Sequence, residues 1–195
     1  MGDLTLKPAR SALLVMDFQP VVLNGLSQAV DLLKSAGKAV ETVRKCNGAI
    51  GYVRVAFEPA DYAAVPQANK AFTAVAAAHA LSAAQQDTTI HPDVAPRPGD
   101  IVVRKTRVGA FSTTDLHVQL KARGIDALIL AGVHTSGVIL STVREAADRD
   151  YRVVIIEDCV ADPDPEVHDL LMRKIFPRQA FITTTDELEH LFADA

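Results

Sequence analysis

Apolar runs that suit buried strands alternate along this chain with stretches of helical periodicity. The strand-like runs are Ser11–Met16, Ala49–Phe57, Ile101–Val103, Asp126–Leu130, Arg152–Ile156 and Ala180–Ile182. Apolar positions at helical spacing predict helices over residues 27–46, 114–123, 136–150 and 165–175, and a short helix near residue 190. Such alternation is typical of a parallel sheet with helices on both faces. We therefore predict one three-layer α/β/α domain over residues 1–195, with a six-stranded, mainly parallel sheet.

Residues 58–99 are the least regular part of the chain, because prolines lie near both of their ends. Between these prolines, Gln67–Ala84 is rich in alanine, which favours helix. We expect a helix there, connecting the second and third strands.

Composition and charge exclude several classes of function. Apolar residues make up 49% of the chain and charged residues 23%, as in ordinary globular proteins. The formal net charge of −4 leaves no basic surface, so nucleic acid is not an expected partner. No apolar run approaches the roughly 20 residues that span a bilayer, and the first ten residues lack the apolar core of a signal peptide. We expect a cytoplasmic protein with no membrane partner, in which Cys46 and Cys159 are reduced, buried thiols.

A sharp strand-to-helix turn is expected within Ala131–Thr142, directly after an apolar strand. Such turns lie at the carboxyl edge of the sheet, where α/β proteins bind ligands. The stretch resembles the active-site elbow of the isochorismatase-like cysteine hydrolases, written G-V-x-T-x-x-C-V. Gly132, Val133 and Thr135 match this pattern, and the nucleophilic cysteine falls on Val138. The chain is thus identified as a member of this superfamily that lacks the nucleophile.

The resemblance implies further properties of the elbow. In the family, the peptide bond that corresponds to Val133–His134 is cis, and backbone N–H groups near the helix start form an oxyanion hole. We therefore assign Val133, His134, Thr135 and Gly137 to this elbow. His134 could contact a ligand, or it could only satisfy a backbone group at the turn.

Two ionisable residues match the other motifs of the family. Asp17 in LLVMDFQ corresponds to the family's general acid and base, although a polar residue at a strand end could instead cap the next helix. Lys105 in KTRVGAF matches K-x-x-x-S-A-F, with Gly109 where serine is usual. A lysine facing a carboxylate keeps it ionised, whereas an isolated lysine is usually solvated.

The residues beside these motifs are predicted to line the pocket. They are Phe18, Gln19, Phe57 and Phe111. Nicotinamidases of this superfamily bind a metal through an aspartate and two histidines after the second strand. Because the corresponding residues 57–62 contain no histidine, we expect no metal and no cofactor. Isochorismatases have glycine at the cysteine position, a glutamine where this chain has Phe57, and a tyrosine in place of His134, so isochorismate is not supported as the substrate.

Three functions remain open. The first is a hydrolase of a small molecule that needs no covalent intermediate, with Asp17 as general acid or base and Lys105 as its partner. The second is a non-catalytic relative, either a small-molecule-binding protein or a structural subunit. The third is a thiol hydrolase that uses another cysteine. Members of the superfamily are commonly dimers or tetramers, and we expect a homo-oligomer whose contact surface could include Ala71–Ala84.

Overall fold

The computed structural model describes residues 4–192 of the chain. Its sheet consists of β1 (Ser11–Met16), β2 (Ala49–Val55), β3 (Ile101–Lys105), β4 (Ala127–Val133), β5 (Arg152–Ala161) and β6 (Phe181–Thr183). The strand order is β3-β2-β1-β4-β5-β6, and all five strand pairings are parallel. The predicted six-stranded α/β sheet is confirmed.

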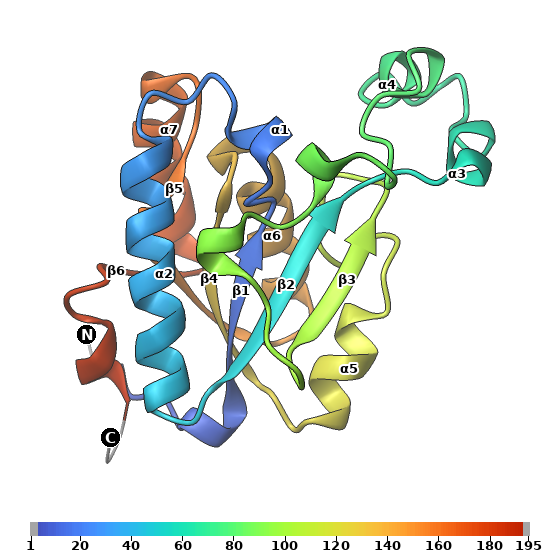
Figure 1. Cartoon of the computed structure of the whole chain (residues 1–195). Coiled ribbons are helices and arrows are strands. Elements are labelled where there is room, and N and C mark those ends of the chain that lie inside the picture. Colours follow the sequence, from blue (N-terminus) through green and yellow to red (C-terminus); the bar gives the residue numbers. More distant parts are fainter. Residues whose placement is uncertain (1–3, 193–195) are drawn as a thin grey trace.

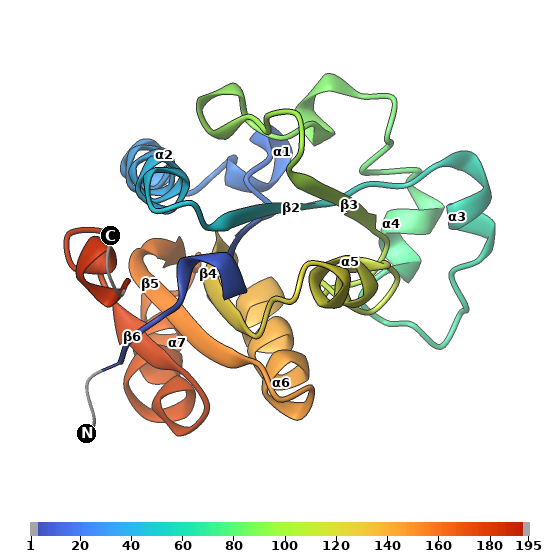
Figure 2. The same ribbon diagram turned by 90° about the horizontal axis from the view of Figure 1, so that it is seen from below.

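Helices cover both faces of this sheet (Figure 2). The α-helices are α1 (Pro20–Leu23), α2 (Ala29–Lys45), α3 (Pro59–Ala63), α4 (Thr73–Ala77), α5 (Leu116–Ala122), α6 (Leu140–Asp148) and α7 (Pro165–Leu170). Helices α1 and α2 lie on one face, and α5, α6 and α7 lie on the other. Among residues 4–192, no helix is both long and apolar enough to cross a membrane.

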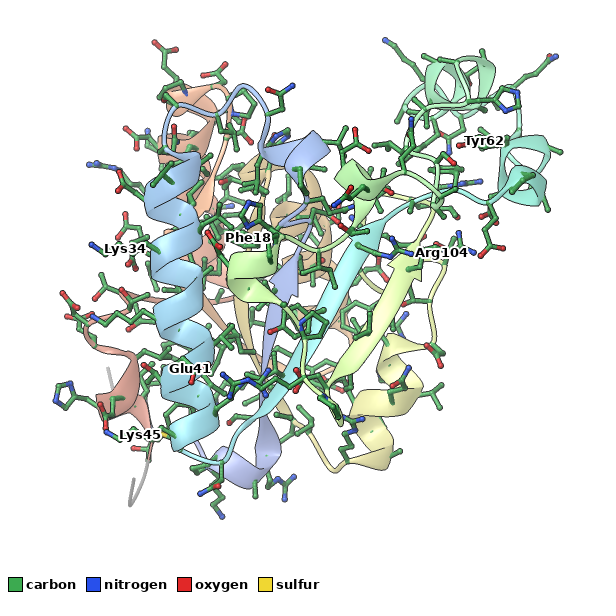
Figure 3. All side chains as sticks on the ribbon, in the orientation of Figure 1. Phe18, Lys34, Glu41, Lys45, Tyr62 and Arg104 are labelled. Carbon is green, nitrogen blue, oxygen red and sulfur yellow. The ribbon has the colours of Figure 1, made fainter. Side chains whose placement is uncertain are left out.

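Strand β1 shows how the sequence fills both layers of the core. Because successive side chains point to opposite faces, Leu13 and Val15 join the apolar cluster beneath α2. Leu14 and Met16 join the cluster beneath α5 and α6. On the outer side of α2, Lys34, Glu41 and Lys45 point away from the sheet (Figure 3).

An arm, which we define as residues 58–87, projects beyond β3 and carries α3 and α4 (Figure 1). The predicted helix over Gln67–Ala84 is wrong in extent, since only Thr73–Ala77 is α-helical. The helix ends where His79 and Leu81 adopt positive φ values of 48° and 58°. Most alanines of the predicted helix are exposed, so packing against the rest of the protein contributes little to its stability. A short helix is marginal without such packing, and the helix therefore stays short.

Two further elements differ from their predicted bounds. Strand β5 continues five residues beyond the predicted end at Ile156, with a shift in its pairing to β4 between Leu130 and Gly132. The exposed pair Glu157 and Asp158 interrupts the apolar run, which is why the sequence pattern ended early. The predicted helix over 136–150 begins as a π-helical turn, Thr135–Ile139, and becomes α-helical only at Leu140.

Candidate active site

The carboxyl ends of β1 and β4 form the point at which the strand order reverses. In open parallel sheets, this is where ligands bind. Asp17 follows β1, and Val133 ends β4, with Met16 and Gly132 side by side in the register. A Cβ on Gly132 would lie 3.0 Å from both Cβ and the carbonyl oxygen of Met16, so only glycine lets the two strand ends approach this closely.

Asp17 and Lys105 form a buried ion pair at this edge. Lys105 Nζ lies 2.7 Å from Asp17 Oδ2, and the side chains are only 2% and 7% exposed. Lys105 Nζ also donates to the carbonyl oxygen of Val108 at 2.5 Å. Lys105 is therefore not the solvated lysine of the alternative interpretation. Asp17 does not cap α1 either, because the N-cap position of that helix is Gln19.

The environment of Asp17 favours a carboxyl group that can hold a proton. Burial raises its pKa, while the charge and hydrogen bond of Lys105 and the charge of His134 oppose this, and the net pKa lies above the ordinary value. Its second oxygen, Oδ1, is buried and has no hydrogen-bond partner within the described residues. Asp17 also has a φ of 59°, which is uncommon for a residue other than glycine and occurs often at functional sites.

The elbow follows directly from β4. The Val133–His134 peptide is cis, as the family resemblance implied. The N–H of Gly137 donates to the carbonyl oxygen of His134 at 3.1 Å, as does that of Ile139 at 3.4 Å. Both hydrogen bonds close the first turn of the elbow on His134. The elbow is stabilised internally rather than left open at that position.

Two side chains from the segment after β5 hold the elbow in place. Asp162 Oδ2 accepts a hydrogen bond from the Ser136 N–H at 2.7 Å. Burial alone would raise the pKa of Asp162, but the hydrogen bonds from Ser136 and the backbone outweigh it and lower the pKa. Thr135 Oγ1 lies 2.9 Å from His168 Nδ1 of α7. Neither Asp162 nor His168 belongs to a motif, so the sequence alone does not predict these contacts.

Comparison with known proteins places this geometry in a family. A family model described as the isochorismatase domain matches residues 11–187. The chain belongs to the isochorismatase family. Over 187 residues it is 33% identical to an uncharacterized isochorismatase family protein, YwoC, from Bacillus subtilis, covering 96% of each chain. It is 30% identical to a probable isochorismatase of Pseudomonas chlororaphis, over 96% of this chain and 89% of the relative.

Solved structures agree with this assignment. An isochorismatase family protein from Burkholderia thailandensis superimposes with a TM-score of 0.81 at 25% identity, covering 96% of this chain and 97% of the other. The protein is therefore an isochorismatase-family, hydrolase-like α/β protein.

In this isochorismatase-family chain, two of the predicted lining residues serve the scaffold. Gln19 is fully buried, and its amide group donates to the carbonyl oxygens of Val55 (2.9 Å) and Thr88 (2.6 Å) and accepts from the Val55 N–H (2.8 Å). Because all of these partners are backbone groups, Gln19 holds the end of β2 and is not free for a ligand. Phe18 packs in the apolar cluster beneath α2.

The other two predicted lining residues lie in separate aromatic groups. The Phe57 ring stacks on Tyr62 of the arm, with centroids 5.3 Å apart. The Phe111 ring stacks on Tyr151 at 6.1 Å, beneath the guanidinium of Arg149. The structure therefore does not bring the four predicted lining residues together.

Residue 138 belongs to the apolar core. Val138 is 2% exposed and lies in the cluster that includes Ala110, Ile139 and Val143. The free cysteines, Cys46 and Cys159, are also buried, and burial raises the pKa of each thiol. Within residues 4–192, no group of three or more acidic, histidine or cysteine side chains is arranged to hold a metal ion.

Proposed function

We propose that this protein hydrolyses a small molecule without a cysteine acyl-enzyme, with Asp17 as the general acid and base. The observation that carries the proposal is the buried 2.7 Å pair of Asp17 and Lys105, whose second carboxylate oxygen has no partner in the described chain. Burial raises the pKa of this carboxyl, which favours its holding a proton that it can pass to a substrate. Lys105 orients this carboxyl through Oδ2 and leaves Oδ1 for the substrate.

The proposal takes the elbow to lack a nucleophile, and this limits the chemistry. Val138 corresponds to the cysteine of the family motif, and a hydrocarbon side chain cannot form an acyl-enzyme. General acid catalysis alone contributes about 10²–10⁴-fold, which suits a reactive bond better than an unactivated amide. We therefore propose a vinyl ether or a labile ester as the substrate class.

For a vinyl ether, the reaction is balanced with one proton and one water molecule. Asp17 protonates the vinyl carbon, and the ether oxygen stabilises the resulting cation. Water adds to the cationic carbon and returns a proton to Asp17. The hemiketal then breaks down to a carbonyl compound and an alcohol, so that no residue is modified during the cycle.

The test compares vinyl ether, ester and amide panels with the native protein and with Asp17→Asn. We expect hydrolysis of a vinyl ether or ester that falls at least about 10²-fold in Asp17→Asn. The matched control is Asp31→Asn on the exposed side of α2, which should retain the native rate. Equal rates for the native protein and Asp17→Asn would refute the proposed mechanism.

A second candidate function is a small-molecule-binding protein without turnover. The burial of Val138 in the apolar core favours it, because the elbow then presents no reactive side chain at that position. Ligand binding would raise the unfolding free energy by about 2.7 kcal/mol at 100 times the Kd. Stabilisation by a compound that is never hydrolysed would support this alternative over the enzyme.

We further propose a homo-oligomer in a reducing, cytoplasmic compartment. The exposed alanines of the projecting arm and the two buried free thiols support these proposals. Light scattering coupled to size-exclusion chromatography would test the oligomer, and a monomer at micromolar concentration would contradict it.

A further inference from the structure

The loop of residues 106–109 lies between the ion pair and the elbow. At its start, Lys105 Nζ reaches over the loop to donate to the carbonyl oxygen of Val108 at 2.5 Å. At its far side, a Cγ atom of Val108 lies 4.0 Å from the position that a Cβ on Gly137 would take. Val108 is therefore close to both Lys105 and the elbow, and Arg107 is its neighbour in the chain.

Arg107 in this loop has a fixed guanidinium group. Its Cζ lies 5.7 Å from the centre of the Phe72 ring of the arm, and Phe72 packs in turn on Phe57, at 5.8 Å between ring centres. One nitrogen, Nη1, donates to the carbonyl oxygen of Thr106 at 2.6 Å. The side chain is half-buried, so part of its conformational entropy is already lost before a ligand binds.

Arg107 forms no ion pair within 4.0 Å among residues 4–192, although its charge contributes at longer range to the lowered pKa of Asp61. Its neighbour Arg104 on β3 contacts both Asp61 (2.5 Å) and Glu58 (3.5 Å), and thereby occupies the two acidic groups at the base of the arm. Figure 3 shows Arg104 on the side of β3 that faces the arm. Arg107 Nε and Nη2 donate to no protein group among the described residues. An arginine held flat with two free donors suits a carboxylate, which it can bind with two parallel hydrogen bonds.

We propose that Arg107 binds a carboxylate of the substrate at the rim of the Asp17–Lys105 site and thereby selects small organic acids over their neutral analogues. This inference rests on the proposed function for the position of the reacting group at Asp17. Lys105 Nζ is already engaged by Asp17 Oδ2 and by the carbonyl oxygen of Val108, so Arg107 is the cation here that keeps free donors for an anionic substrate. Because consecutive Cα atoms are about 3.8 Å apart, the backbone of Arg107 lies within about 8 Å of that of Lys105.

The test measures binding rather than turnover. Sodium crotonate, benzoate and maleate, each with its neutral amide, and inorganic phosphate are titrated at constant ionic strength and followed by amide chemical shifts. The native protein should bind at least one carboxylate more tightly than its amide. Arg107→Gln should weaken carboxylate binding about tenfold and leave amide binding unchanged, whereas Arg107→Lys should fall between the two. The control Arg123→Gln, an exposed position at the end of α5, should match the native protein.

Several results would overturn the proposal. They are equal carboxylate affinity in the native protein and Arg107→Gln, the absence of carboxylate binding across the panel, and Arg107-dependent binding of phosphate alone. Parallel loss of carboxylate and amide binding would indicate a structural role and would also refute it. The two proposals can fail separately. If Asp17→Asn loses hydrolysis while Arg107→Gln keeps the native carboxylate selectivity, the proposed hydrolase is supported and the role of Arg107 is refuted. If carboxylate selectivity depends on Arg107 but no substrate is hydrolysed, the role of Arg107 is supported and the proposed hydrolase is refuted.

Discussion

Replacing Lys105 by methionine tests whether the ion pair is as buried as the structure indicates. The change removes one charge from a pair whose side chains are 2% and 7% exposed and leaves Asp17 without its counter-ion. Removing one member of a buried pair typically costs about 3–5 kcal/mol, since the remaining charge is uncompensated. That is a large part of the roughly 5–15 kcal/mol by which domains are stable.

The pH dependence of this loss follows from the sign of the pKa shift. The pKa of Asp17 is already raised by burial, and loss of Lys105 removes the main opposing influence, so it rises further. A carboxyl whose folded pKa exceeds its unfolded value of about 3.9 contributes its full stability below that pH. The contribution is lost as pH rises toward the folded pKa, by up to about 1.4 kcal/mol per pH unit. Lys105→Met should therefore be much closer to the native stability at pH 5 than at pH 8.

Urea denaturation at pH 5 and pH 8 measures the loss of unfolding free energy and its dependence on pH. The double variant Asp17→Asn, Lys105→Met should recover much of the lost stability and lose the added pH dependence. Lys38→Met, which breaks the exposed ion pair with Asp186, is the surface control and should change little at either pH. A Lys105→Met variant that is as stable as the native protein at pH 8, or that shows the same loss at both pH values, would refute the buried pair.

Other substitutions test the scaffold around the site. Gln19→Leu leaves the buried N–H and carbonyl groups of Val55 without their side-chain partner, whereas the Thr88 carbonyl keeps its hydrogen bond from Arg54 Nη1 at 3.1 Å. The substitution should lower the unfolding free energy by about 3 kcal/mol in urea denaturation. Gly132→Ala should lower the unfolding free energy by about 1–3 kcal/mol, because the added methyl group overpacks against β1. Gly37→Ala in α2 should raise the unfolding free energy by up to about 1 kcal/mol, because a Cβ there would lie 3.5 Å from its nearest neighbour, a carbonyl oxygen. Cys46 and Cys159 should resist iodoacetamide in the native protein and react in urea, as read by mass spectrometry; rapid native labelling linked to loss of hydrolysis would instead support a thiol enzyme.

The sheet could be predicted from the sequence because its strands are buried on both faces. In β1, all six residues from Ser11 to Met16 are buried, so the apolar run marks the strand without ambiguity. The arm could not be predicted in the same way. Its alanines favour helix locally, but few of them are buried, and the turn at His79 and Leu81 ends the helix without a glycine or proline to mark it.

The same distinction applies to the site. Asp17 and Lys105 follow apolar runs and belong to motifs, so their place at the carboxyl edge could be expected. Their contact also depends on the order of the strands, with β1 and β3 on either side of β2, which the apolar pattern does not reveal. Gln19 looked like a lining residue because it follows the motif, yet it bonds to backbone about 36 and 69 residues away in sequence. His168 was missed because no motif links it to Thr135, 33 residues earlier.

The contacts that maintain the ionisable groups and the elbow do not pass through residue 138. Lys105 is held by Asp17 and the backbone of the 106–109 loop, and the elbow by Asp162 and His168. An apolar residue at position 138 is therefore compatible with an intact polar site. Stability alone does not explain why the Asp17–Lys105 pair is buried, because well-packed apolar side chains are often equally or more stabilising. In addition, Asp17 Oδ1 has no hydrogen-bond partner in the described chain. A buried pair that leaves one carboxylate oxygen free is better explained by a role toward a ligand than by folding, as both proposed functions require.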